Sequence, residues 1–304
     1  MYDVIVVGAG PAGLTAAVYA RRADKSVLVI ERATFGGQMT FSPKIENYPA
    51  FSQISGNELA DRMVEQALGM GAEIEMAEVT GIEKQNGVFY VSCDDGQYLA
   101  HTVILATGSK HRHLGLDREE EFIGNGISFC AVCDGAFYNG KTVAVIGGGN
   151  SALVEAMMLS DGCSKVYVVQ NLDYMTGEER LVASLEKRDN VEFITGTVVD
   201  SIYAEDEFGG IIIKNVASGE KERLDVDGIF VAIGQVPENE QYANLVELSE
   251  RGYVVSDENC LTSTEGLFVA GDCRTKNIRQ ITTACGDGAT AALAACRYID
   301  NCKM

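Results

Sequence analysis

Short runs of β-branched and other apolar residues recur along the chain, and segments with helical periodicity follow several of them. Runs of this length between turn residues are typical of buried strands, and their alternation with helices predicts an α/β fold with parallel sheets. The runs are Val4–Val7, Val27–Ile30, Val103–Leu105, Val143–Ile146, Val166–Val169, Gly228–Ile233 and Leu267–Ala270.

Two of these runs lead into glycine clusters, and each cluster is followed by a predicted helix and a further strand. The clusters are Gly8-Ala9-Gly10-Pro11-Ala12-Gly13 and Gly147-Gly148-Gly149-Asn150-Ser151-Ala152. Because this is the pattern of a dinucleotide-binding unit, we expect two Rossmann-like dinucleotide-binding domains. The run Leu267–Ala270 is interpreted as a late strand of the first domain, so that the second domain is inserted into the first.

Polar segments with little periodicity at Lys110–Leu116 and Gln235–Asn244 are the predicted connections between the domains. The expected first domain consists of residues 1–112 and 243–304, and the expected second domain of residues 113–242. Two connections at matching places suggest a hinge.

The composition supports two domains and narrows the range of partners. A chain of 304 residues, 46% of them hydrophobic, is longer than one hydrophobic core usually serves. Its 24 Lys and Arg residues against 44 Asp and Glu residues give a net charge of −20, which repels phosphate backbones and anionic lipids. Nucleic acid and membrane surfaces are therefore not expected as partners.

The location follows from the first residues and the lengths of the apolar runs. No run reaches the roughly 20 apolar residues that a membrane helix needs. Met1-Tyr2-Asp3 leads directly into the strand Val4–Val7, without the charged and apolar regions of a secretory signal. We expect a cytoplasmic protein.

The first glycine cluster has the residues that a dinucleotide site needs. Gly8 permits the tight turn, Gly10 lets the backbone approach a pyrophosphate, and Gly13 allows the helix to pack closely on the strand. Glu31 closes the next strand, where a carboxylate can accept hydrogen bonds from a ribose diol. This pattern does not by itself separate FAD from NAD.

Among the nine cysteines, only Cys130-Ala131-Val132-Cys133 has a spacing that indicates chemistry. Two intervening residues let the sulfurs bridge at the first turn of a helix, whose end lowers the pKa of the thiolate that disulfide exchange requires. Half of a zinc site is the alternative, but there is no second CxxC, and His101, His111 and His113 lack ligand spacing. We interpret His111 and His113 as solvated linker residues.

Four further segments resemble, in order and spacing, the FAD-contacting segments of the low-molecular-weight thioredoxin reductases. They are Gly36-Gly37-Gln38, Glu46-Asn47-Tyr48-Pro49, Ala106-Thr107-Gly108 and Gly271-Asp272-Cys273. The resemblance spans nearly the whole chain and implies a flavoprotein that holds FAD and forms a homodimer. It also implies that Asp272 holds the ribityl and phosphate region and that a helix beginning at Arg279-Gln280-Ile281 points its N-terminus at the flavin pyrimidine. The implied FAD-binding residues are Gly8, Gly10, Pro11, Ala12, Gly13, Glu31, Gly37, Gln38, Asn47, Val79, Ala106, Thr107, Gly108, Gly271, Asp272, Arg279, Gln280 and Ile281.

The segment Ser128–Gly135 is very similar to the active-site motif of the same family. By this resemblance Cys133 receives electrons from the flavin, Cys130 attacks the substrate disulfide, and Asp134 donates or accepts the proton. The alternative for Asp134 is a helix charge without a catalytic role. Cys302 has no neighbouring cysteine, and we interpret it, with Cys285 and Cys296, as structural.

The resemblance breaks in the second dinucleotide site. Members that prefer NADPH carry arginines just past the second strand, where they pair with the 2′-phosphate. No arginine stands at the matching positions of Val168–Glu179, which holds Asp173, Glu178 and Glu179 instead. Arg180 and Lys165 are the only cations expected within reach of a 2′-phosphate. We therefore predict a preference for NADH over NADPH. The expected nucleotide contacts are Gly147, Gly149, Asn150, Ser151, Ala152, Gln170, Asn171, Ile233 and Gly234, with Gln170 and Asn171 at the ribose.

Together these features predict that electrons pass from a nicotinamide nucleotide through FAD and Cys130/Cys133 to a thioredoxin-like protein. By the resemblance, the domain that carries the pair rotates between turnovers. One alternative is a related flavoprotein that takes electrons from ferredoxin or oxidises small dithiols. A more distant one is a non-catalytic FAD redox sensor. A ferredoxin–NADP reductase is disfavoured because its chemistry has no use for the cysteine pair.

Overall fold

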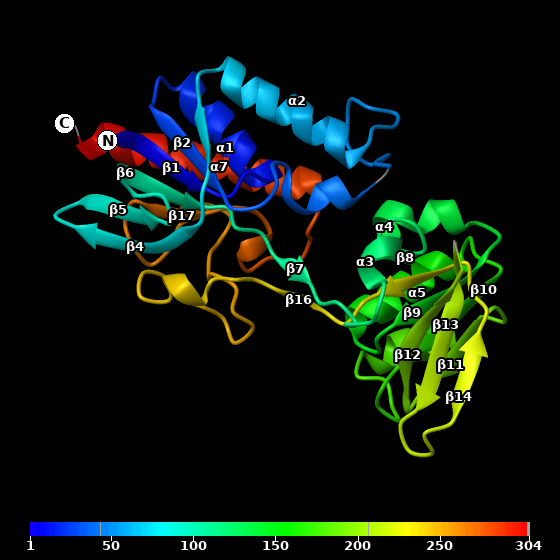
Figure 1. Ribbon diagram of the computed structural model, residues 1–304. Coiled ribbons are helices and arrows are strands. Elements are labelled where there is room, and N and C mark those ends of the chain that lie inside the picture. Colours follow the sequence, from blue (N-terminus) through cyan, green and yellow to red (C-terminus); the bar gives the residue numbers. More distant parts are fainter. Residues whose placement is uncertain (43, 206, 303–304) are drawn as a thin grey trace. The chain divides into compact units, whose positions relative to one another are not determined.

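The computed structural model describes residues 1–42, 44–205 and 207–302. These residues form two compact units (Figure 1). The first unit comprises Met1–Lys110 and the segment that begins at Val236, and the second unit is His111–Gln235. Each unit is described below by itself.

The first unit is built on a seven-stranded sheet. Its strands are β1 Tyr2–Val7, β2 Val27–Glu31, β3 Glu73–Met76, β4 Val79–Gln85, β5 Val88–Cys93, β6 Gln97–Leu105 and β17 Leu267–Val269. Parallel strands run in the order β3-β2-β1-β6, β17 pairs with β6, and β5 and β4 continue the sheet in antiparallel fashion. The strand from Val4 to Val7 is buried throughout, as expected where layers cover both faces of a parallel sheet.

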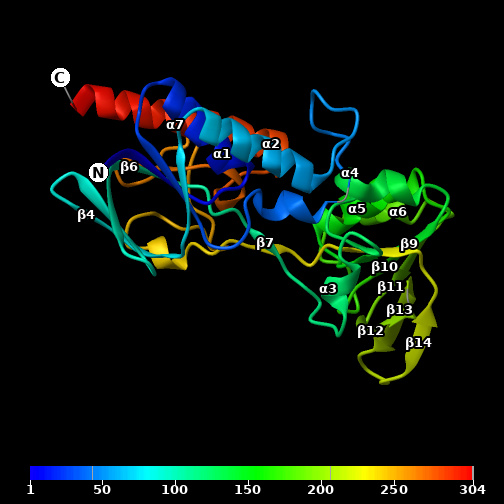
Figure 2. The ribbon, with the colours of Figure 1, turned by 45° about the horizontal axis from the view of Figure 1, so that its top comes forward.

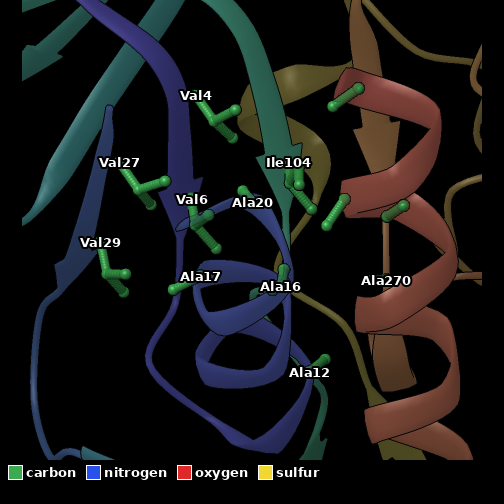
Figure 3. Packing of buried hydrophobic residues seen from close by; sticks show 14 of the residues in the cluster. Val4, Val6, Ala12, Ala16, Ala17, Ala20, Val27, Val29, Ile104 and Ala270 are labelled. Carbon is green, nitrogen blue, oxygen red and sulfur yellow. The ribbon is translucent and has the colours of Figure 1, made fainter. Parts of the chain in front are cut away.

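Three helices cover one face of this sheet: α1 Pro11–Arg22, α2 Gly56–Gly69 and α7 Ile281–Cys302. They lie side by side (Figure 2). Small residues let them approach closely, and Ala12, Ala16 and Ala20 of α1 line the contact region (Figure 3). A Cβ built on Gly288 of α7 would lie 2.1 Å from the carbonyl oxygen of Ala12. The first turn of α1 therefore packs closely against both the sheet and α7.

The second unit has a five-stranded parallel sheet in the order β11-β10-β9-β15-β8 and a separate antiparallel sheet in the order β12-β13-β14. The strands are β8 Ile127–Ser128, β9 Thr142–Ile146, β10 Lys165–Val169, β11 Val191–Ile194, β12 Thr197–Ala204, β13 Phe208–Asn215, β14 Lys221–Leu224 and β15 Gly228–Val231. The small sheet packs on one face of the parallel sheet, where Ile211 and Ile213 meet Ile146 and Val169.

The other face of this parallel sheet is covered by helices that share an apolar cluster with it. They are α4 Ala131–Asp134, α5 Asn150–Ser160 and α6 Glu179–Leu185. The short helix α3 Glu119–Phe122 packs with the small antiparallel sheet through Phe122. Shorter elements of the chain are η1 Gly37–Phe41, β7 Lys110–His111, η2 Gly135–Tyr138, β16 Gln235–Val236, η3 Glu240–Tyr242 and η4 Gly271–Cys273. The α/β class with two Rossmann-like folds, predicted from the sequence, is confirmed.

The unit boundaries differ from the expected ones, 112/113 and 242/243, mainly at the second crossing. The chain returns to the first unit at Val236, because Tyr242 is 1% exposed in the core of that unit with Val246 and Val254. Within residues 1–42, 44–205 and 207–302, no helix combines the length and apolar character needed to cross a membrane.

Candidate functional site

Each glycine of the first cluster is required for a different reason. Gly8 has φ +108°, and a Cβ there would lie 2.3 Å from the carbonyl oxygen of Ala106. A Cβ on Gly13 would lie 1.9 Å from the carbonyl oxygen of Gly8. At Gly10 an added Cβ meets nothing within 4 Å. Gly8 and Gly13 therefore hold the turn together, whereas Gly10 leaves space above it for a ligand.

This difference gives a test of the cofactor site. We expect Gly10→Ala to change the free energy of unfolding of the FAD-free protein by no more than about 1 kcal/mol, while weakening FAD binding at least about tenfold because the methyl group occupies the pyrophosphate space. Gly13→Ala should instead destabilise the apoprotein by about 2 kcal/mol or more. Urea unfolding and fluorescence titration with FAD measure the two effects. Unchanged FAD affinity in Gly10→Ala would refute this location of the pyrophosphate.

A cleft beside this turn brings together several predicted FAD residues. Gly8, Glu31, Val79 and Thr107 all line it. The Glu31 carboxylate accepts the backbone N–H of Ala9 at 2.8 Å and that of Ala33 at 2.9 Å, so it is fixed at the end of β2. The lining also includes residues that no motif indicates, among them Arg32, Glu78, Glu238 and Gln241.

Two further predicted FAD segments contact other parts of the first unit. A Cβ on Gly37 would lie 3.4 Å from Cα of Gly10, so the segment Gly36-Gly37-Gln38 passes directly over the glycine turn. The side-chain amide of Asn47 donates to Oε1 of Gln280 at 3.1 Å, just before α7 begins at Ile281. Gln38 is exposed beside these contacts.

Asp272 supplies the best test of whether a cofactor fits this unit. Burial raises the pKa of its carboxyl to about 6, and its Oδ1 is buried without a hydrogen-bond partner. Such a group is costly unless a ligand donates to it. The Nε of Arg279 donates to the backbone carbonyl of Asp272 at 3.4 Å, and its guanidinium lies over the ring of Tyr253. Hydroxyl groups of a bound FAD would supply the missing donors, so these residues fit FAD.

A buried ion cluster fixes the loop that carries Asp272. Asp287 of α7 accepts the backbone N–H of Gly271 at 3.0 Å and pairs with Arg274 at 2.9 Å and Lys276 at 2.8 Å. The Arg274 side chain is 4% exposed and that of Asp287 is 11% exposed. The aspartate thus ties η4 to the helix behind it.

We expect Asp287→Asn to lower the free energy of unfolding of the apoprotein by about 3 kcal/mol, because it leaves two buried cations without their counter-charge. Urea unfolding measures the loss. Glu58→Gln, which breaks the exposed pair with Arg62 on α2, is the matched control and should cost less than about 0.5 kcal/mol. Equal effects of the two substitutions would contradict the importance of the cluster.

In the second unit Cys130 and Cys133 form a disulfide, with their Cα atoms 5.3 Å apart. The backbone N–H of Cys133 donates to the sulfur of Cys130 at 3.2 Å, an interaction that strengthens when that sulfur becomes a thiolate. Asp134 accepts the Ser128 hydroxyl at 2.6 Å. Burial raises the pKa of Asp134, against the effect of the Ser128 bond, and Oδ1 has no partner. The pair therefore has a buried carboxyl beside it that can hold a proton.

The interpretation of His111 as a solvated linker residue is wrong. Its ring stacks on Phe129 at 4.8 Å, and that of His113 stacks on the same ring at 5.2 Å. Burial lowers the pKa of His111 to about 4, so it is neutral at physiological pH. His113 is exposed and pairs with Glu120. Phe129 immediately precedes Cys130, so both rings contact the residue next to the redox pair.

The second glycine cluster keeps the turn geometry. A Cβ on Gly147 would lie 2.6 Å from the carbonyl oxygen of Ala232, whereas a Cβ on Gly234 meets nothing within 4 Å. Asn150 begins α5, followed by the exposed Ser151 and the buried Ala152. The residues that the sequence assigns to the turn, including Ile233 after β15, therefore lie around one βα junction.

The segment after β10 folds back over this turn. The carbonyl oxygen of Gly148 accepts the N–H groups of Thr176 and Gly177, both at 2.9 Å. The side chain of Asn150 binds the backbone N–H of Glu178 at 2.7 Å and its carboxylate at 3.3 Å. A carboxylate thus lies at the start of α5.

The two residues expected at the ribose differ in position. Gln170 is 6% exposed, and its amide bonds within the loop to the N–H of Asn171 and the carbonyl of Tyr174. Asn171 itself is exposed. Of the two, Asn171 is the one placed for contact with a ligand.

The remaining cysteines are free thiols in the described part of the chain. Cys302 is exposed, Cys285 half-buried and Cys296 buried. The described residues contain no group of three or more histidine, cysteine or acidic side chains placed to hold a metal ion. Among described cysteines, a disulfide joins Cys130 and Cys133 alone.

Comparison with known proteins agrees with this geometry. The pyridine nucleotide-disulphide oxidoreductase family matches residues 2–288. The thioredoxin reductase of Treponema pallidum (strain Nichols) is 42% identical over 98% of this chain and 97% of its own length. That of Bacillus subtilis (strain 168) is 39% identical over 99% and 95% of the two lengths. The crystal structure of thioredoxin reductase from Streptococcus pyogenes MGAS5005 matches with a TM-score of 0.94 and 39% identity over 99% of each chain.

Proposed function

This chain belongs to the thioredoxin reductases of the pyridine nucleotide-disulphide oxidoreductase family, and on that premise we propose that it reduces a thioredoxin-like protein with electrons from a nicotinamide nucleotide. The observation that carries the proposal is the Cys130–Cys133 disulfide with the buried acid Asp134 beside it. It lies in the unit with the second dinucleotide turn, while the other unit has the residues that fit FAD. When bound, FAD supplies the redox chemistry that couples hydride transfer from a nicotinamide nucleotide to the two-electron reduction of a disulfide.

Different residues of the chain bind FAD and carry out the disulfide exchange. Gly8, Gly10 and Glu31 bind the adenosine and pyrophosphate part of FAD, and Asp272 accepts hydrogen bonds from its hydroxyl groups. Two electrons break the Cys130–Cys133 bond. The Cys130 thiolate, stabilised by the backbone N–H of Cys133, attacks a disulfide sulfur of the partner and displaces the other sulfur as a thiolate.

The exchange is completed within the pair. Cys133 attacks the mixed disulfide at the Cys130 sulfur, so the Cys130–Cys133 bond re-forms and the second partner sulfur leaves as a thiolate. Two protons convert the partner to a dithiol. Asp134, with its raised pKa and unpartnered oxygen, is placed to hold and transfer a proton for the departing thiolate.

The preferred donor in this proposal is NADH. The support is the loop after β10, where Asn171 and Leu172 are exposed, no arginine is present, and Asp173 and Glu178 add negative charge. A 2′-phosphate would meet this charge, and Arg180, the cation just past the loop, is paired with the Glu178 carboxylate. Losing each charge-assisted hydrogen bond costs about 1.5–3 kcal/mol, and about 1.4 kcal/mol is a tenfold change in affinity.

The test is anaerobic titration of the FAD-loaded protein with NADH and, separately, NADPH, followed by the visible absorbance of oxidised flavin. Bleaching by NADH at much lower concentration than by NADPH supports the proposal. Equal potency of the two nucleotides would refute the NADH preference alone. Bleaching by neither, with dithionite still effective, would move a ferredoxin-type donor to first place, and bleaching without reduction of any thioredoxin would favour a redox sensor.

We further propose that the enzyme is a cytoplasmic homodimer. Exposed apolar side chains on the helical layer of the first unit, among them Tyr19, Leu68 and Leu293, support a self-association surface. The free thiols are compatible with a reducing compartment. Sedimentation equilibrium tests the assembly, and a monomer at micromolar concentration would contradict it.

A further inference from the structure

Three buried side-chain oxygens in residues 1–42, 44–205 and 207–302 have no hydrogen-bond partner, and all three belong to carboxyl groups: Asp134 Oδ1, Glu155 Oε2 and Asp272 Oδ1. Asp134 and Asp272 already have places in the proposed function. Glu155 has none, and neither the glycine fingerprint nor the cysteine motif includes it. A buried oxygen without a partner is rare enough to require an explanation.

Glu155 belongs to the surroundings of the redox pair. It lies on α5, which packs against α4, and its carboxyl accepts the backbone N–H of Ala131. Ala131 directly follows Cys130 and is buried in the same apolar cluster as Ala152 and Ala156 of α5. One carboxyl oxygen is therefore held at Ala131, one of the two residues between the cysteines, and the other is enclosed without a donor.

No charged neighbour accounts for the raised pKa of the Glu155 carboxyl group. Burial raises the pKa of its carboxyl to about 8, opposed by the Ala131 hydrogen bond, and no other group contributes. At neutral pH this side chain is therefore a neutral acid. The titratable or charged groups on the elements packed against α5 are Asp134 on α4, Tyr138 on η2, Lys165 and Tyr167 on β10, and Glu179 and Arg180 on α6, besides the bridged Cys133.

We propose that Glu155 is a positioning residue for the redox pair, kept protonated beside Ala131 so that the thiolate of the reduced pair forms next to a neutral acid instead of a second negative charge. The inference rests on the proposed disulfide chemistry of Cys130 and Cys133. Two electrons break the S–S bond, one sulfur takes a proton from solvent and becomes a thiol, and the other remains a thiolate. Glu155 keeps its own proton throughout.

A pH dependence follows from this arrangement. A thiolate nearby disfavours ionisation of Glu155, so the reduced protein binds the proton of Glu155 more tightly than the disulfide form does. Because the pKa of Glu155 is higher in the reduced protein than in the disulfide form, proton binding by Glu155 favours reduction. This contribution is lost as the pH rises through the pKa of Glu155 in the reduced protein. The reduced pair should therefore become less favourable above about pH 8, the pKa of Glu155 in the disulfide form.

The experiment equilibrates the FAD-loaded protein with dithiothreitol redox buffers between about pH 6.5 and about pH 9.5, and measures the reduced fraction by alkylation of Cys130 and Cys133. Wild type and Glu155→Gln should have similar equilibrium constants at the acid end. At the alkaline end, the wild-type equilibrium constant for reduction divided by that of Glu155→Gln should fall about tenfold for each pKa unit by which the thiolate raises the pKa of Glu155. Glu186→Gln, an exposed acid in the same unit, should follow wild type.

Parallel pH profiles of wild type and Glu155→Gln would overturn the proposal. Should Glu155→Gln fail to fold, the infrared difference spectrum between oxidised and reduced Asp134→Asn decides, because that substitution removes the other buried carboxyl beside the pair. A shifted carboxylic-acid C=O band then supports a protonated Glu155, and its absence overturns the proposal. Neither measurement uses a nicotinamide nucleotide or thioredoxin. A failure of the proposed reductase function is therefore distinguishable from a failure of this inference.

Discussion

Serine in place of Cys133 should lower the turnover of a thioredoxin-like substrate by at least about three orders of magnitude, while flavin bleaching by the nicotinamide donor persists. The substitution removes the sulfur that closes the Cys130–Cys133 bond, so the mixed disulfide at Cys130 has no internal thiol to resolve it. We expect this variant to accumulate a covalent complex with the partner. Non-reducing electrophoresis with an insulin-coupled activity assay measures both effects.

The matched substitutions assign the two cysteines. Cys130→Ser should lose turnover equally but form no covalent complex, because the attacking thiolate is absent. Cys302→Ser removes an exposed free thiol and should leave turnover unchanged. A covalent complex with Cys130→Ser and none with Cys133→Ser would reverse the proposed roles, and full activity of either variant would remove the pair from the reaction.

The sequence predicts the parts of the structure that local spacing determines. Gly8, Gly10 and Gly13 belong to one turn, so their roles follow from steric requirements within six consecutive positions. The structure has close contacts at Gly8 and Gly13 and open space at Gly10, as those roles require. Cys130 and Cys133 are likewise near enough in sequence to bridge within one turn of chain. The fold class can be predicted from the sequence because apolar runs alternate with helical segments along most of the chain.

Features that depend on contacts between distant residues could not be predicted in this way. Glu155 meets Ala131 only because α5 packs on α4, and a glutamate in a helix normally lies in solvent. Asp287 gives no signal that it binds Gly271. The antiparallel strand β4 buries Val79 and Ile82, which are three positions apart, and ends in the polar residues Glu83, Lys84 and Gln85, so it lacks the alternating apolar pattern of a strand.

The second large effect concerns the donor. Replacing Asn171 and Leu172 together with arginine should raise kcat/KM for NADPH relative to NADH by at least about a hundredfold, because each guanidinium can form a charge-assisted pair with the 2′-phosphate, worth about 1.5–3 kcal/mol. Both side chains are exposed after β10, so the substitution should fold normally. Steady-state reduction of the partner with each nucleotide measures the ratio.

The position of the added charge, not its sign alone, should decide this result. Ser164→Arg places a cation at an exposed position just before β10, at the opposite end of that five-residue strand from Asn171 and Leu172. It should change the NADPH-to-NADH ratio less than about twofold, since a strand rises about 3.3 Å per residue and screening weakens exposed charges beyond about 10 Å. Because Asp173 and Glu178 remain in the double variant, its gain is a lower limit on what the loop can provide. An unchanged ratio would mean that the 2′-phosphate does not approach this loop, and the NADH preference would then need a cause elsewhere in the unit.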